Sequence, residues 1–108
     1  MTGADAEFLY LTTIGRRSGQ PREIEIWFTR CDRRYYLVAE HREEAQWVRN
    51  LRAEPRVRAR VGDATFDATA RVVDATAEGE LCGQVRARSE EKYGWGDGLV
   101  VEVTPLSA

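Results

Sequence analysis

Hydrophobic and polar residues alternate along several short stretches of this chain, which is the pattern of β-strands that bury one face. In residues 22–30, REIEIWFTR, this alternation places Ile24, Ile26 and Phe28 on one face and Trp27 on the other. Glycine, proline and the Asp32-Arg33 pair stand between such stretches and favour turns. The pattern predicts six strands, at residues 7–14, 22–30, 34–40, 56–62, 64–73 and 99–105.

The first predicted helix lies between the third and the fourth strand. In residues 41–54, Ala45, Val48 and Leu51 recur at helical spacing. Because a proline disfavours the helical conformation of the residue before it, we expect this helix to stop ahead of Pro55.

The second predicted helix starts at Thr76, a residue type that favours helix N-caps, and runs to about Lys92. Leu81 and Val85 form its buried face. Residues 93–98, YGWGDG, contain three glycines and are expected to break the helix before the last strand.

The predicted elements follow the order βββαββαβ, and short links join the first three strands. Six short antiparallel strands with two helices predict a mainly β protein of the α+β class, a small antiparallel barrel that is closed by the helices or packed against them. Its 108 residues suit a single domain over residues 1–108.

Composition excludes several classes of function. A net charge of −2 gives no support to nucleic acid as a partner. No apolar run approaches the roughly 20 residues that span a bilayer, and the first residues lack the pattern of a signal peptide, so we expect a cytoplasmic protein without a membrane span. His41 is the only histidine, which excludes a multi-histidine metal site, and Cys31 and Cys82 are expected to be free thiols.

Arginines gather at two places. Arg56, Arg58 and Arg60 alternate along one predicted strand, as charged residues do on the solvated face of a sheet. The second group lies in the turn between the first two strands, residues 15–22, GRRSGQPR. Since arginines there combine with a serine hydroxyl and a permissive glycine, the turn is either merely solvated or a binding site for an anion.

Two segments, LTTIGRRSGQPR (residues 11–22) and WVRNLRAEPRV (residues 47–57), resemble those of the deazaflavin-dependent nitroreductase family. The similarity covers roughly residues 9–62 well. It implies a split β-barrel of the pyridoxamine-phosphate-oxidase type, with a deazaflavin, coenzyme F420, as the hydride carrier. Flavin mononucleotide (FMN) is the alternative cofactor.

The resemblance also implies a set of site residues. The turn would hold the phosphate and acidic tail of the cofactor, and Trp27 would lie beside its ring. Tyr93 would donate a proton to the reduced substrate or stack on it, with Trp95 as a mobile lid. The residues expected to bind the cofactor are Arg16, Arg17, Ser18, Gly19, Gln20, Arg22, Trp27, Ala39, Arg42, Trp47 and Asn50.

The chain departs from the family pattern at residues 40–46, EHREEAQ, where members have a glycine-rich loop with a lysine. Arg42 or His41 would have to replace the missing positive charge. The expected reaction is hydride transfer from the reduced deazaflavin to a small electron-poor acceptor: a quinone, a nitro compound or an activated alkene. The alternatives are an FMN-binding reductase and a non-catalytic barrel that binds a ligand or dimerises. A homodimer is expected, because a small barrel with an exposed groove leaves apolar surface to cover.

Overall fold

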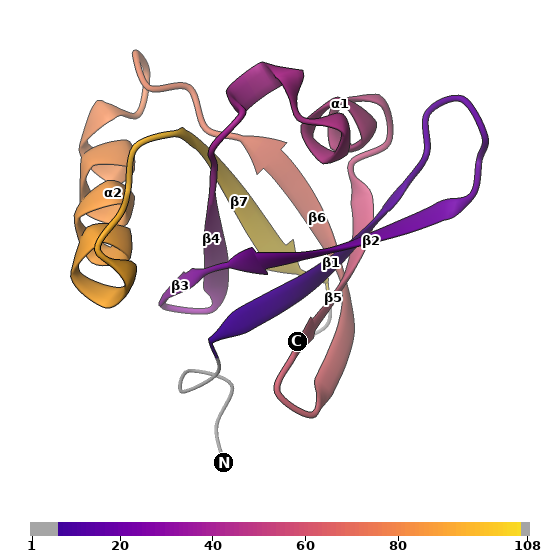
Figure 1. Ribbon diagram of the computed structural model, residues 1–108, viewed down its shortest axis with the longest axis horizontal. Helices are drawn as coiled ribbons and strands as arrows, with labels where there is room; N and C mark the ends of the chain where they lie inside the picture. The colour runs from indigo at the N-terminus through magenta and orange to yellow at the C-terminus, as the bar shows by residue number, and fades with distance from the viewer. Residues whose placement is uncertain (1–6, 107–108) are drawn as a thin grey trace.

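One curled antiparallel sheet of seven strands carries two helices, α1 and α2, in the computed structural model, which describes residues 7–106 (Figure 1). Along the sheet the strands are ordered β2-β1-β5-β6-β7-β4-β3. The strands are β1 (Phe8–Ile14), β2 (Pro21–Trp27), β3 (Thr29–Cys31), β4 (Arg34–Ala39), β5 (Arg56–Val61), β6 (Ala64–Val72) and β7 (Leu99–Pro105). The two helices are α1 (Gln46–Ala53) and α2 (Gly79–Tyr93), and a short 3-10 turn, η2 (Arg42–Glu44), precedes α1. The α+β class with two helices is confirmed.

Phe28 divides the predicted strand 22–30 into two strands, which corrects the predicted count of six. β2 pairs with β1 and β3 pairs with β4, at opposite ends of the strand order. Since Phe28 alone joins them, the two edges of the sheet meet at this residue and the sheet curls round on itself. Where a strand changes partners, its backbone N–H and C=O groups lose the hydrogen bonds of the sheet, and side chains of α2 supply these hydrogen bonds instead. The Phe28 N–H donates to the Tyr93 hydroxyl at 3.2 Å, and Lys92 Nζ donates to the Phe28 carbonyl at 3.0 Å.

The strand pattern predicts the buried faces correctly. On β5, Val57, Ala59 and Val61 are buried while the arginines between them are exposed. Two of those arginines have acidic partners: Arg58 Nε lies 3.1 Å from Asp67 and Arg60 lies 3.8 Å from Glu23. The stripe is thus a solvated surface, as expected, and two of its three arginines are ion-paired.

The first helix begins later than predicted. Arg42 has a left-handed φ of 51° and residues 42–44 form a 3-10 turn, so the range 41–54 is wrong at its start. Ala45, which packs against the core, is extended at φ −63° and ψ 132°, and the α-helical pattern begins only at Gln46. Val48 is buried as expected.

The predicted N-cap at Thr76 is also wrong, because the N-cap is Glu78, two residues later, and α2 begins at Gly79. Thr76 instead belongs to a turn that the Asp74 carboxylate holds, accepting the N–H of Thr76 at 2.8 Å and that of Ala77 at 3.4 Å. The helix ends where Gly94 takes a left-handed φ of 77°, a conformation that glycine adopts without strain.

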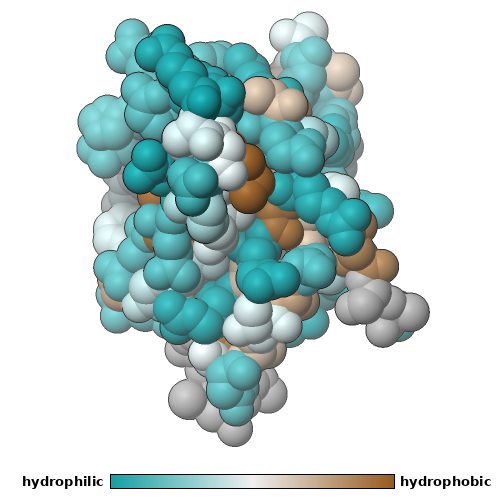
Figure 2. Space-filling model, turned by 90° about the vertical axis from the view of Figure 1, so that its right-hand side faces the viewer, coloured by the Kyte–Doolittle hydropathy of each residue, from teal (hydrophilic) through white to brown (hydrophobic). Residues whose placement is uncertain are grey.

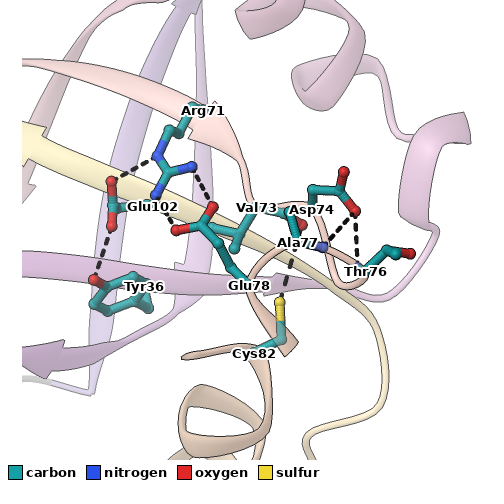
Figure 3. A network of polar contacts seen from close by, with 9 residues as sticks. All are labelled: Tyr36, Arg71, Val73, Asp74, Thr76, Ala77, Glu78, Cys82 and Glu102. Atoms are coloured by element: carbon teal, nitrogen blue, oxygen red, sulfur yellow. Dashed lines mark hydrogen bonds and ion pairs between the residues drawn. The ribbon is translucent and has the colours of Figure 1, made fainter. Parts of the chain in front are cut away.

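A polar network fastens this turn to the sheet (Figure 3). The Arg71 guanidinium donates from Nε to the Glu102 carboxylate at 2.9 Å and from Nη1 to Glu78 at 2.6 Å. On its other side, Glu102 accepts the Tyr36 hydroxyl at 2.9 Å. Burial acts to raise the pKa of Glu102, but the hydrogen bonds from Arg71 and Tyr36 outweigh it and the pKa lies below its ordinary value. The buried carboxylate is therefore ionised and fully paired.

Tyr36 makes the stability of the protein fall as the pH becomes strongly alkaline. Burial, and then the hydrogen bond to Glu102, raise the pKa of Tyr36 to about 12. The unfolded side chain ionises near its ordinary pKa of about 10, so the stabilisation is complete below that pH and declines as the pH rises towards 12. We expect urea unfolding at pH 8 to 11.5 to show a smaller loss of stability in Tyr36→Phe than in the wild type. Equal losses in the two proteins would contradict this.

Candidate functional site

The turn between β1 and β2 is closed by its own backbone. The Gly15 N–H donates to the Gln20 carbonyl and the Gly19 N–H to the Gly15 carbonyl, each at 2.8 Å. Gly19 has a φ of 71°, as expected for this position. The Ser18 hydroxyl accepts the Gln20 N–H at 3.1 Å. The chain is thus shaped before any ligand binds.

Helix α1 holds Arg16 in place. Asn50 Oδ1 accepts the Arg16 N–H at 3.2 Å and the guanidinium Nη1 at 2.9 Å, and Gln46 Oε1 accepts Nη2 at 2.8 Å. The buried Asn50 amide also donates to Thr13 Oγ1 at 3.3 Å. Because these partners are all neutral, they orient the guanidinium without cancelling its charge.

Below the turn lies a cavity of about 370 Å³, the anion cavity, whose wall includes Arg16, Arg17 and Arg22. No carboxylate of residues 7–106 lines it, and none of these arginines forms an ion pair within that range. Hydrophilic side chains surround a small hydrophobic area on this face of the molecule (Figure 2). Three guanidinium groups without acidic partners favour a ligand of several negative charges.

A second cavity, the aromatic cavity, adjoins the first and measures about 610 Å³. Ile24 and Trp47 line both cavities. Trp27 and Trp95 also line the aromatic cavity, so all three tryptophans of the chain face it. A cavity faced by three tryptophans beside a cationic one suits a ligand with an aromatic ring and an anionic tail.

The structure brings most of the predicted cofactor-binding residues to these two cavities and leaves some outside. Arg42 forms an ion pair with Asp97 at 3.0 Å and lines neither cavity, whereas His41 lines the aromatic cavity. Ala39 is buried in the core, and Gly19 and Gln20 shape the turn without lining either cavity. The predicted residues that line a cavity are Arg16, Arg17, Ser18, Arg22, Trp27, Trp47 and Asn50.

Tyr93 supports the aromatic cavity from behind. Its ring stacks on Trp27 with centroids 4.6 Å apart and planes 7° from parallel. Its hydroxyl lies among backbone groups, 2.9 Å from the Phe28 carbonyl and 2.6 Å from that of Glu7. It lines neither cavity, so its expected role as a proton donor stays a prediction.

The backbone around Trp95 is fastened to α2. Ser89 Oγ donates to the Trp95 carbonyl at 2.7 Å, and the Arg86 guanidinium donates to the Gly98 carbonyl at 3.0 Å. A side chain at Gly96 would collide with the Arg86 carbonyl. These contacts fasten the backbone beside the aromatic cavity, and the role of Trp95 as a mobile lid stays a prediction.

Gln46 and Thr13 belong to the site and were absent from the sequence prediction. Gln46 precedes Asn50 by one helical turn, so the two share a face of α1, and this spacing is the signal that could have found it. Thr13 lies on the buried face of β1, where a hydroxyl is not expected.

A metal site and a membrane-spanning helix are not found in the part of the chain that the structure describes. Within residues 7–106 no group of three or more histidine, cysteine, aspartate and glutamate side chains is placed to hold a metal ion. In the same range no helix has the length and apolarity needed to cross a membrane.

Comparison with solved structures identifies the fold. The heme storage protein HutZ from Vibrio cholerae superposes with a TM-score of 0.79 at 23% identity, over 98% of this chain and 86% of that one. An FAD-binding protein from Mesorhizobium loti gives 0.77 at 13% identity, over 97% and 85% of the two chains. An F420-H2 dependent reductase, FDR-A, gives 0.64 at 24% identity, over 90% and 93%. The predicted split β-barrel of the pyridoxamine-phosphate-oxidase type is confirmed.

The sequence itself matches a known family over nearly its whole length. Residues 2–103 match the family described as F420H(2)-dependent quinone reductase. That description agrees with the site, since the arginines of the anion cavity suit the acidic tail of a deazaflavin and the tryptophans suit its ring. Deazaflavin-dependent reduction is the chemistry of this family. The protein belongs to the F420H(2)-dependent quinone reductase family, and its cofactor is the deazaflavin coenzyme F420.

Proposed function

We propose that the protein binds reduced coenzyme F420 across its two cavities and reduces a small electron-poor acceptor held in the aromatic cavity. The observation that carries this proposal is the charge of the anion cavity: Arg16, Arg17 and Arg22 lie together, without acidic partners among residues 7–106, next to a cavity faced by three tryptophans. The acceptors proposed are quinones, nitro compounds and activated alkenes.

The residues present fit the cofactor. Guanidinium groups make paired hydrogen bonds to phosphate and carboxylate oxygens, and Arg16 is already oriented for this by Asn50 and Gln46. When bound, the reduced cofactor supplies the hydride. The protein therefore has to bind and orient the cofactor and the acceptor, and to exclude water from them. Ile24 and Trp47, which line both cavities, are placed to hold the apolar part of the ligand where the cavities meet.

The test is a fluorescence titration of coenzyme F420 with the wild type and with the double variant Arg17→Ala/Arg22→Ala. Each lost charge-assisted contact is expected to weaken binding about tenfold, and the affinity of the wild type is expected to fall with added salt. The matched control is Arg58→Ala/Arg60→Ala, which changes the net charge equally on the ion-paired surface of β5 and is expected to leave the affinity unchanged.

Two outcomes would contradict the proposal. An unaltered affinity of Arg17→Ala/Arg22→Ala for F420 would show that the acidic tail of the cofactor does not bind in the anion cavity. FMN is titrated in parallel, and binding of FMN without F420 would indicate a flavin reductase. The homodimer and the single-domain organisation stay predictions.

A further inference from the structure

The two adjoining cavities carry opposite charge. Arginines and no acid of residues 7–106 line the anion cavity, while the ionisable residues that line the aromatic cavity are Glu25, Glu40 and His41, with no arginine or lysine of that range. The change of sign takes place across the shared wall of Ile24 and Trp47. A ligand in the groove therefore meets positive charge at one end and negative charge at the other.

Glu40 is the carboxylate in the aromatic cavity that has no partner among residues 7–106. Glu25 accepts the hydroxyl of Tyr10 at 2.8 Å, whereas among residues 7–106 no hydrogen bond or ion pair reaches the side chain of Glu40. Arg42, only two residues away, pairs with Asp97 at 3.0 Å. The charge of Glu40, which lies directly after β4, is thus available to a ligand.

We propose that Glu40 selects the acceptor by charge, so that the aromatic cavity takes neutral and cationic planar acceptors and rejects anionic ones. This inference rests on the proposed function and names the acceptor class for the same site. A carboxylate at the edge of an apolar cavity attracts a cation and repels an anion more strongly than it would in open water, because the cavity wall has a low dielectric constant. The same repulsion directs the acidic tail of the cofactor to the anion cavity and keeps it out of the aromatic cavity.

The test uses three naphthoquinones that share one ring system: an unsubstituted one, one with a sulfonate and one with a quaternary ammonium group. Because all three tryptophans face the aromatic cavity, quenching of tryptophan fluorescence measures their binding to the protein without cofactor. The kcat/KM for each quinone with reduced F420 is the second readout. In the wild type we expect the cationic quinone to bind about tenfold more tightly than the anionic one.

Three variants separate the effect of Glu40 from bulk charge. Glu40→Gln is expected to weaken the preference for the cation, with the charge of Glu25 remaining in the cavity, and Glu40→Lys to weaken it further. Glu44→Lys is the matched control, since it makes the same change of charge in the same segment at a side chain that lines neither cavity. It is expected to keep the wild-type ratio, and the melting temperature of each variant confirms folding.

The failure of this inference differs from the failure of the proposed function. An unchanged ratio in Glu40→Gln and Glu40→Lys, or an equal change in Glu44→Lys, would overturn the role of Glu40. Loss of the arginine effect on F420 binding would overturn the proposed function, and the fluorescence ratio of the three quinones would still test Glu40, because it is measured without cofactor.

Discussion

Replacing Gly98 with alanine is expected to lower the melting temperature by about 10 °C, since overpacking a tight contact costs about 1–3 kcal/mol and each kcal/mol shifts a domain of this size by about 4–8 °C. A Cβ at Gly98 would lie 2.5 Å from the Ala39 carbonyl oxygen and 2.8 Å from Val38 Cγ1. The backbone oxygen cannot move away without breaking the pairing of β4 with β7. Gly96→Ala is expected to have a similar effect, because its Cβ would meet the Arg86 carbonyl.

Gly83 gives the matched control for both substitutions. It lies inside α2 with open space where a Cβ would stand. Alanine favours a helix interior over glycine by about 1 kcal/mol, so Gly83→Ala is expected to raise the melting temperature by several degrees. Thermal unfolding followed by circular dichroism measures all three. If Gly98→Ala melted at the same temperature as the wild type, the segment around Trp95 would not be packed tightly against β4, which would favour the mobile lid.

Two substitutions of Asn50 are expected to distinguish the effect of Arg16's orientation from the effect of its charge on F420 binding. Asn50→Leu removes the acceptor of two Arg16 bonds and the donor to Thr13, and each buried group left unpaired costs about 1–3 kcal/mol. This variant should lose both stability and affinity for F420. Asn50→Asp keeps the acceptor but adds a negative charge beside Arg16, so we expect a nearly wild-type melting temperature and an affinity lower by about tenfold or more.

Melting curves and F420 titrations on the same samples measure both effects. Thr13→Val serves as the control, because it removes one hydrogen bond of Asn50 and leaves the contacts of Arg16 in place. A wild-type affinity in Asn50→Asp would show that the charge of Arg16 does not reach the ligand.

Much of the fold follows from the alternation of residue types, because each strand buries one face. The division at Phe28 does not follow from it. Ile24, Ile26 and Phe28 keep the same period through the point where the chain changes partner, so the pattern reads as one strand. The change of partner depends on β1 and β4, and on the hydroxyl of Tyr93, which lies 65 residues further along the chain.

The site was predictable where it depends on a single turn, and less so where the backbone reverses its direction locally. The arginines at positions 16, 17 and 22 lie within one hairpin, and the structure brings all three to one cavity. Arg42 and His41 are neighbours in sequence, yet the left-handed φ of Arg42 sends their side chains to different surroundings. No periodicity reveals such a local reversal.

The position of β7 in the sheet has a consequence for how the chain folds. β7 lies between β6 and β4, so it joins the group β2-β1-β5-β6 to the pair β4-β3. All the other strands are thus synthesised before the two groups can be connected across the sheet. Because pairing over long stretches of sequence slows folding, the barrel is completed late, after its C-terminal strand has become available.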